Sequence, residues 1–396
     1  MRYKSLDGLR GIAAVIVLVH HCLIIVPFFL KVHFHEISNN ENNLLLQVSH
    51  VFWAGHEAVL LFFILSGFVL HNTVQNLTTY KEYFLNRFSR IYVPYIASII
   101  LSASLYILFY RTNLIANQSG FSDWFNTMWP VPIDYLSIVS AIFMTGYNTH
   151  SINTVTWSLI HELRISLVLP IIVWWVAKNN RLLYLLTSIC FLFVFNFVNM
   201  FVIPTKFGLY INLMLMNLND TLYYMIFFMI GIYLAMNKEK VMVSFKKLSS
   251  STALFLLFIG ILLFLFEWIF PSIAQEKYSS NIYLSKVSIF STDMLISLGV
   301  VIIFCLTISY KPIKYFLERK VFLFLGKISY SLYLVHPIII LCVVHATGEY
   351  LNYSTLIVLS IGLSLIMGTI FYFIIERYSL LLIRKRNMEI RNKDVV

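Results

Sequence analysis

Two polar residues, Arg10 and His21, lie inside the first strongly apolar stretch of the chain, separated by the ten residues GIAAVIVLVH. In an α-helix, eleven steps of about 100° bring both side chains back to one face, roughly 16 Å apart along the axis. A cation and an imidazole at membrane depth are costly unless they face a cavity, a partner or a substrate. The pair therefore predicts a functional site, in which the imidazole is a candidate base.

His20 is the rival to His21 as the base. It lies about 80° from the helix face of Arg10, whereas His21 lies about 20° from that face. The geometry of the helix therefore favours His21.

A second group of cations follows the second apolar stretch, where NRFSR places Arg87 and Arg90 three residues apart. Residues at this spacing share a helix face, and two guanidinium groups can bind phosphate oxygens in a bidentate manner. Anchoring at the cytoplasmic membrane surface is the simpler explanation when this segment is taken alone. A phosphorylated cytosolic ligand is the functional interpretation.

The segment WSLIHELRIS carries Glu162 and Arg164 inside another apolar stretch. The two residues are two positions apart, on roughly opposite helix faces, so each needs a partner elsewhere. We expect Glu162 to contact an imidazole or a substrate hydroxyl. For Arg164 we expect a structural ion pair with Glu57, Asp293 or Glu267. The alternative for Glu267, which lies near the outer end of its span, is that it faces water.

The elements that must position these residues are predicted to be membrane-spanning helices. A mean hydropathy of +0.80, with 59% hydrophobic and 12% charged residues over 396 positions, is typical of a polytopic all-α membrane protein. We expect a single transmembrane domain over residues 1–380, a basic cytoplasmic tail over 381–396, and a shorter amphipathic segment near 133–146. About ten spans are predicted, at 8–30, 51–71, 91–110, 155–177, 182–203, 218–236, 252–270, 288–309, 326–344 and 354–376.

The formal charge of +11 reflects topology in this interpretation. Lys and Arg cluster before the first span, in every second loop and in the tail, so the positive-inside rule predicts both termini in the cytoplasm. Nucleic-acid binding is therefore not expected. The four cysteines all fall within predicted spans and lack metal-ligand spacing, so neither a metal site nor a disulfide is predicted.

Five ordered blocks of this sequence and a short closing motif resemble acyltransferase family 3, a family of integral-membrane proteins. SLDGLRGIAAVIVLVHH resembles its N-terminal signature with an Arg and a His separated by ten residues, and VLLFFILSGFVL its second-span block. RFSRIYVPY, WSLIHELRISLVLP and GKISYSLYLVHP resemble three further blocks, and ERY its closing Glu-Arg. The chain departs from the family at Leu60, where many members carry an acidic residue, so no role is transferred to that position.

The resemblance implies transfer of an acyl group, usually acetyl, from cytosolic acetyl-CoA as co-substrate to a hydroxyl of a glycan or lipid-linked sugar. Chemistry from the residues agrees with this role, because esterification needs a base for the hydroxyl proton and a site for CoA. His21 is the candidate base and Glu162 the residue that orients or stabilises its imidazole. Arg10, Arg87 and Arg90 are the candidate ligands of the CoA phosphates. Direct transfer is favoured over an acyl-enzyme, because no other nucleophile is well placed.

These inferences place the protein in the plasma membrane, as a multi-pass protein of a bacterial inner membrane in contact with lipid. The alternative function is a proton-coupled transporter or flippase of a lipid-linked sugar, in which the intramembrane His, Glu and Arg form a proton relay. Such a transporter would more readily show duplicated halves, and the sequence shows none. The acceptor, the acyl chain length, the oligomeric state and the roles of Arg164 and His336 are left open.

Overall fold

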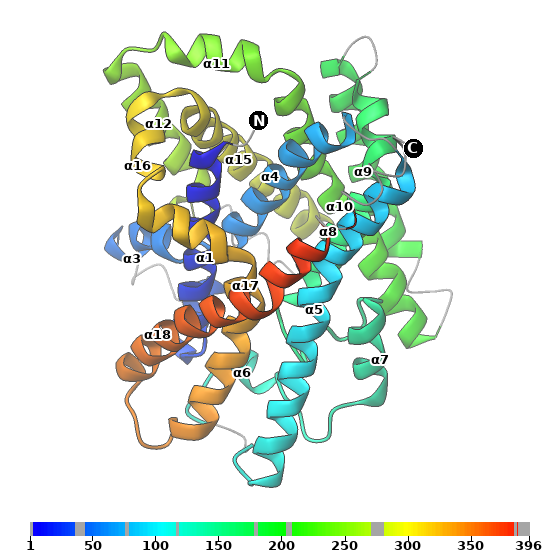
Figure 1. The fold of residues 1–396 in the computed structure, drawn as a ribbon, viewed down its shortest axis with the longest axis vertical. Helices are drawn as coiled ribbons and strands as arrows, with labels where there is room; N and C mark the ends of the chain where they lie inside the picture. Colours follow the sequence, from blue (N-terminus) through cyan, green and yellow to red (C-terminus); the bar gives the residue numbers. More distant parts are fainter. Residues whose placement is uncertain are drawn as a thin grey trace. The chain divides into compact units, whose positions relative to one another are not determined.

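The computed structural model describes residues 3–35, 44–75, 79–115, 119–177, 181–202, 208–270, 281–383 and 386. Regular structure in these residues is entirely helical (Figure 1). Nine helices within the described residues are long and apolar enough to cross a membrane. The predicted polytopic all-α fold is therefore confirmed. Residues 384–385 and 387–396, which make up most of the predicted tail, lie outside the described residues.

The helices succeed one another along the chain with short connections. Their bounds are α1 Lys4–Ile24, α2 Pro27–His33, α3 Leu44–Ser49, η2 His50–Phe52, α4 Gly55–Gln75, α5 Tyr80–Arg111, α6 Asp123–Asn126, α7 Tyr135–Phe143, α8 Thr156–Val176, α9 Arg181–Val202, α10 Leu209–Met236, α11 Lys238–Lys246, α12 Ser250–Phe264, α13 Phe266–Ile269, α15 Ile282–Ser309, α16 Lys311–Leu317, α17 Lys320–Thr347, α18 Tyr353–Phe371 and η5 Tyr372–Glu376. The short amphipathic segment expected near 133–146 is a helix, α7.

The seventh expected span, 252–270, is not one continuous helix. The apolar helix α12 has 15 residues and ends at Phe264, after which Leu265 leaves the helical conformation with φ −97° and ψ 19°. The chain then forms α13, a single turn over Phe266–Ile269. Hydropathy detects the apolar length of this segment but not the break at Leu265, because neither Gly nor Pro marks it.

The described residues fall into two compact units, each assembled from segments distant in sequence. Unit 1 contains Met1–Val69, Val176–Phe197 and Ile226–Ser329, and unit 2 contains Leu70–Trp175, Val198–Met225 and Tyr330–Val396. In unit 1, α12 packs along α15, and α1 contacts α2, α15 and α16 (Figure 1). In unit 2, α5 contacts α7 and the π-helix η5.

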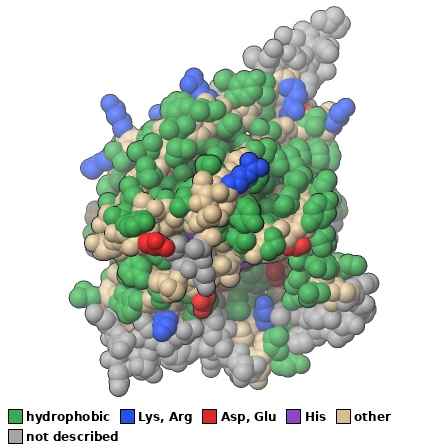
Figure 2. Space-filling view, turned by 90° about the horizontal axis from the view of Figure 1, so that it is seen from below, with side chains coloured by type: hydrophobic (Ala, Val, Ile, Leu, Met, Phe, Trp, Pro, Cys, Tyr) green, Lys and Arg blue, Asp and Glu red, His purple; other side chains and the backbone are tan. Residues whose placement is uncertain are grey.

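The outward-facing side chains of many helices are apolar. On α8, for example, Ile171 and Trp174 are 67% and 61% exposed. Figure 2 shows a face of the molecule on which hydrophobic side chains predominate and charged side chains are sparse. Such a surface is what a protein surrounded by lipid requires, because hydrocarbon cannot solvate charge.

Close helix contact fixes the segment that carries Arg10. A Cβ added at Gly11 of α1 would lie 2.5 Å from the backbone nitrogen of Gly326, and one added at Gly326 would collide with the carbonyl oxygen of Asp7. Small residues allow two helix backbones to approach in this way. The glycines on either side of this crossing therefore hold the start of α1 against α17.

We expect Gly11→Ala to lower the free energy of unfolding by about 1–3 kcal/mol, because the added methyl group overpacks the α1–α17 contact. Gly362→Ala in α18 is the matched control, since nothing lies within 4 Å of a Cβ added there. That control should be neutral or stabilising by up to about 1 kcal/mol, from helix propensity. Thermal unfolding in detergent measures both variants, and equal unfolding temperatures for the two would contradict this packing argument.

The small pair Ser66 and Gly67 in α4 also allows a close neighbour. A Cβ at Gly67 would collide with the carbonyl oxygen of Phe228 in α10, and one at Gly231 with the carbonyl oxygen of Ile64. These contacts lie within unit 1. Gly67 therefore serves helix packing.

Candidate functional site

Arg10 and His21 lie on one continuous helix, α1, which spans Lys4–Ile24 without a proline. Both side chains are partly exposed, whereas residues between them such as Ala14 and Leu18 are buried. The eleven-residue interval therefore keeps its predicted helical geometry, with the two side chains near one face and roughly 16 Å apart along the axis.

His20 has a different environment from His21. Its side chain is buried, and Nδ1 donates a hydrogen bond of 2.9 Å to the carbonyl oxygen of Trp53. Its ring also contacts the rings of His21 and His33, and a Cβ at Gly55 would lie 2.6 Å from it. His20 is thus a packed and hydrogen-bonded residue of the interior, and His21 is the less buried of the two imidazoles.

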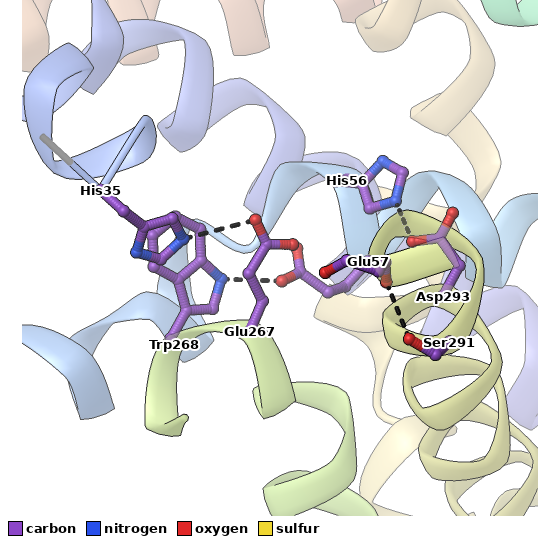
Figure 3. Close-up of polar contacts among 8 residues, drawn as sticks. His35, His56, Glu57, Glu267, Trp268, Ser291 and Asp293 are labelled. Atoms are coloured by element: carbon purple, nitrogen blue, oxygen red, sulfur yellow. Dashed lines mark hydrogen bonds and ion pairs between the residues drawn. The ribbon is translucent and has the colours of Figure 1, made fainter. Parts of the chain in front are cut away.

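Next to these histidines, unit 1 contains three polar contacts between residues far apart in sequence. His56 Nε2 lies 2.8 Å from Asp293 Oδ1, and Trp268 Nε1 donates a 2.7 Å hydrogen bond to Glu57 Oε1. His35 Nε2 lies 3.4 Å from Glu267 Oε1. We call the residues His20, His33, His35, His50, Trp53, His56, Glu57, Glu267, Trp268 and Asp293 the histidine–carboxylate cluster, part of which Figure 3 shows.

The position of Glu267 corrects one expectation from sequence. The residue does not face water, because it is only 2% exposed and pairs with His35. Figure 3 shows its carboxyl group next to that of Glu57, with Trp268 beside them. The sequence could not indicate this burial, because the partner His35 lies 232 residues away.

In unit 2 the predicted phosphate ligand Arg87 is engaged by a predicted catalytic residue. Its Nη2 donates to Glu162 Oε1 at 2.5 Å, with the two side chains 9% and 22% exposed. The Nε atom of Arg87 is buried and has no hydrogen-bond partner among the described residues. Arg90, one turn further along α5, is exposed. The Arg87–Glu162 pair thus joins α5 to α8 within unit 2.

Tyr330 and Glu376, to which the sequence analysis assigned no role, complete this region. Tyr330 donates a hydrogen bond of 2.8 Å to the carbonyl oxygen of Ile91, and its hydroxyl is within electrostatic reach of Arg87, Arg90, Glu162 and Glu376. Ser331 donates to Glu376 Oε2 at 2.5 Å. We call Arg87, Arg90, Glu162, Tyr330 and Glu376 the charged cluster of unit 2.

The π-helix η5, Tyr372–Glu376, ends at Glu376. A π-turn adds a residue to the helical repeat, which changes the direction of the side chains that follow, and such turns are frequent at functional sites. In the sequence, Glu376 is marked only by the ERY motif. Its place at the end of the last span would otherwise indicate an anchor at the membrane interface.

The prediction that Arg164 forms an ion pair with a carboxylate is wrong. Its partners within the described residues are neutral oxygens: Nη1 donates to Asn217 Oδ1 and Thr221 Oγ1 at 2.7 and 3.1 Å. Its Nη2 donates to the carbonyl oxygens of Met144 and Thr145 at 3.0 and 2.8 Å. Carbonyl groups opened by the turn after α7 thus replace a carboxylate as acceptors. Arg164 is a structural residue of unit 2.

The structure brings the candidate residues together in two groups. Arg10 and His21 share helix α1 in unit 1, and Arg87, Arg90 and Glu162 belong to the charged cluster of unit 2. No group of three His, Cys, Asp or Glu side chains suited to a metal ion occurs in the residues that the structure describes.

Comparison with known proteins shows a family match that covers almost the whole chain. The profile of a family described as an acyltransferase domain matches residues 3–374. No curated protein and no solved structure matches the chain. The matched region contains α1 with Arg10 and His21, the Arg87–Glu162 pair and the segment around Tyr330, and by this match the chain belongs to acyltransferase family 3.

Proposed function

We propose that this protein transfers an acyl group, most simply acetyl, from cytosolic acyl-CoA to a hydroxyl of a glycan or lipid-linked sugar, with His21 as the general base. The observation that carries the proposal is the pair Arg10 and His21, partly exposed on one membrane helix in a chain that matches an acyltransferase domain over residues 3–374. An imidazole is the common side chain for proton transfer near neutral pH.

The proposed reaction balances without a metal or a redox partner. The acceptor oxygen forms a bond to the thioester carbonyl carbon as its proton passes to His21, and the carbon–sulfur bond then breaks. The imidazolium returns the proton to the CoA thiolate, so the products are an ester and free CoA and no net proton is released. A single base that accepts the hydroxyl proton and then transfers it to the CoA thiolate is therefore sufficient.

The arginines supply the site for the CoA phosphates in this proposal. Arg90 is exposed on α5, and Arg87 keeps a buried Nε donor that no described residue uses. Guanidinium groups bind phosphate oxygens through charge-assisted, often bidentate hydrogen bonds. Arg10 at the start of α1 is the third proposed ligand.

Glu162 acquires a more specific proposed role from its contact. The carboxylate of Glu162 accepts a hydrogen bond from Arg87 and so holds that guanidinium in one orientation. Glu162 is therefore proposed as a positioning residue for binding of the acyl donor. The contact with the imidazole of His21 expected from sequence stays a prediction.

Deleting the gene in its native host tests the proposal against the transporter alternative. We expect glycans of the cell envelope to lose mass equal to acetyl groups, and complementation with the wild-type gene to restore it. A transporter would instead leave the acetyl content of each glycan unchanged and alter its amount. Unchanged glycan masses in the deletion strain would therefore contradict the proposed function.

A further inference from the structure

Arg386, the last residue that the structure describes, contacts helix α5 within unit 2. Its Nη2 donates a 2.5 Å hydrogen bond to Asn86 Oδ1, although the two residues are 300 positions apart. An earlier contact joins the same segments, because Ser379 Oγ donates to the carbonyl oxygen of Ser89 at 3.1 Å. These two contacts place Arg386 beside the part of α5 that carries the arginines of the charged cluster.

The charge of Arg386 meets a neutral partner. Asn86 offers an amide oxygen, which accepts one of the several N–H groups of the guanidinium. The Nε atom of Arg386 is buried and has no hydrogen-bond partner among the described residues. A buried donor that makes no hydrogen bond is costly, and a guanidinium group binds anionic oxygens most strongly. The environment of Arg386 is therefore suited to an anion.

Arg386 and Arg90 lie along one face of α5. Asn86 and Arg90 are four residues apart, so they share a helix face and are separated by about 6 Å along the axis. Arg90 is exposed and Arg386 is partly exposed, whereas the side chain of Arg87 is 9% exposed and is paired with Glu162. This face of α5 thus presents two accessible guanidinium groups, one turn apart.

The chemistry of CoA matches two such groups in a fixed order. One ribose of CoA carries a pyrophosphate on its 5′ oxygen, which leads to the pantetheine and the thioester, and a phosphate monoester on its 3′ oxygen. When the thioester reaches into the membrane, the 3′-phosphate lies on the far side of the pyrophosphate. In the predicted topology α5 begins in the cytoplasm, so Asn86 lies on the cytoplasmic side of Arg90. Arg90 is thus placed for the pyrophosphate and Arg386 for the 3′-phosphate.

We propose that Arg386, positioned by Asn86, binds the 3′-phosphate of the CoA donor and makes the protein selective for CoA over dephospho-CoA, which lacks that group. The inference rests on the proposed function, because it names the residue that recognises one part of the proposed donor. Arg386 lies beyond residues 3–374, which match the family profile, so this role is not transferred from the family. A guanidinium can bind a phosphate monoester through two parallel charge-assisted hydrogen bonds.

Equilibrium binding of CoA and dephospho-CoA tests the proposal without any acyl transfer. The full-length protein is purified in detergent, and isothermal titration calorimetry measures the Kd of each nucleotide. We expect Arg386→Ala to weaken CoA binding about 10–100-fold, as loss of hydrogen bonds to a charged group allows, and to change dephospho-CoA binding by less than about twofold. The wild type should prefer CoA by a similar factor. A loss of stability would weaken both nucleotides together, so the ratio of the two Kd values reports the 3′-phosphate contact.

Three further variants on α5 separate this contact from a general effect of charge. Lys81→Ala removes an exposed cation near the start of the helix and should leave the ratio of the two Kd values unchanged. Arg90→Ala should weaken both nucleotides alike, because both contain the pyrophosphate. Asn86→Ala keeps the guanidinium of Arg386 but removes its anchor, so it should weaken CoA binding alone, and by less than Arg386→Ala.

The proposal is overturned if Arg386→Ala weakens both nucleotides equally, or if this variant binds CoA as tightly as the wild type does. Either result, with both nucleotides bound by the wild type, would leave the proposed function intact. Failure of the wild type to bind either nucleotide would instead contradict the proposed function together with this inference.

Discussion

His21→Ala should lower the turnover of acyl transfer by about 10²–10⁴-fold, the usual contribution of a general base. The variant loses the group proposed to take the hydroxyl proton, but it removes only a partly exposed side chain near the end of α1. Folding and membrane insertion should therefore be retained. Turnover measured with labelled acetyl-CoA, at equal amounts of folded protein, gives the size of the effect.

His20→Ala is the matched control on the neighbouring residue. It removes a buried ring together with its 2.9 Å hydrogen bond to the carbonyl oxygen of Trp53, so it should lower stability by about 1–3 kcal/mol. Turnover per folded molecule should remain close to that of the wild type. If His20→Ala abolished turnover and His21→Ala retained it, the assignment of the base would be wrong.

Arg87→Ala should lower the free energy of unfolding by about 1.5–3 kcal/mol, because it removes the charge-assisted 2.5 Å bond between α5 and Glu162 of α8. The loss should be smaller in Arg87→Ala/Glu162→Gln, where the carboxylate charge that Arg87 balances is removed as well. Thermal unfolding of the two single variants and the double variant forms a double-mutant cycle that measures the coupling.

Arg90→Ala, three residues along the same helix, separates stability from donor binding. Its side chain is exposed, so the free energy of unfolding should change by less than about 0.5 kcal/mol. Its effect should instead appear as a higher KM for acetyl-CoA.

For the Arg87/Glu162 double-mutant cycle, stability losses that simply add, with no coupling energy, would show that the ion pair does not act as a unit.

Local patterns in the sequence predicted the features that depend on a single helix, namely its apolar length and the relative positions of its side chains. The position of Arg10 and His21 on one face of α1 follows from helical periodicity alone, and so does the opposition of Glu162 and Arg164 on α8. Apolar length predicted nine of the spans, because in lipid the backbone must satisfy its hydrogen bonds within each segment. The break at Leu265 was missed, because no residue type marks it.

Partners across the fold could not be predicted in the same way. Arg87 and Glu162 are 75 residues apart, and His56 and Asp293 are 237 residues apart. Hydropathy and periodicity carry no information on which helices meet. The neutral ligands of Arg164 depend on a turn whose conformation the sequence did not indicate, so the rule that a buried cation needs a carboxylate gave the wrong partner.

The most direct measurement of the central claim is transfer of labelled acetyl from acetyl-CoA in membranes that contain the protein. We expect label on a glycan hydroxyl as a base-labile ester, with one CoA thiol released for each acetyl transferred, and we expect both signals to disappear with His21→Ala. Unlabelled glycans in membranes with the wild-type protein, or undiminished ester formation by His21→Ala, would contradict the central claim.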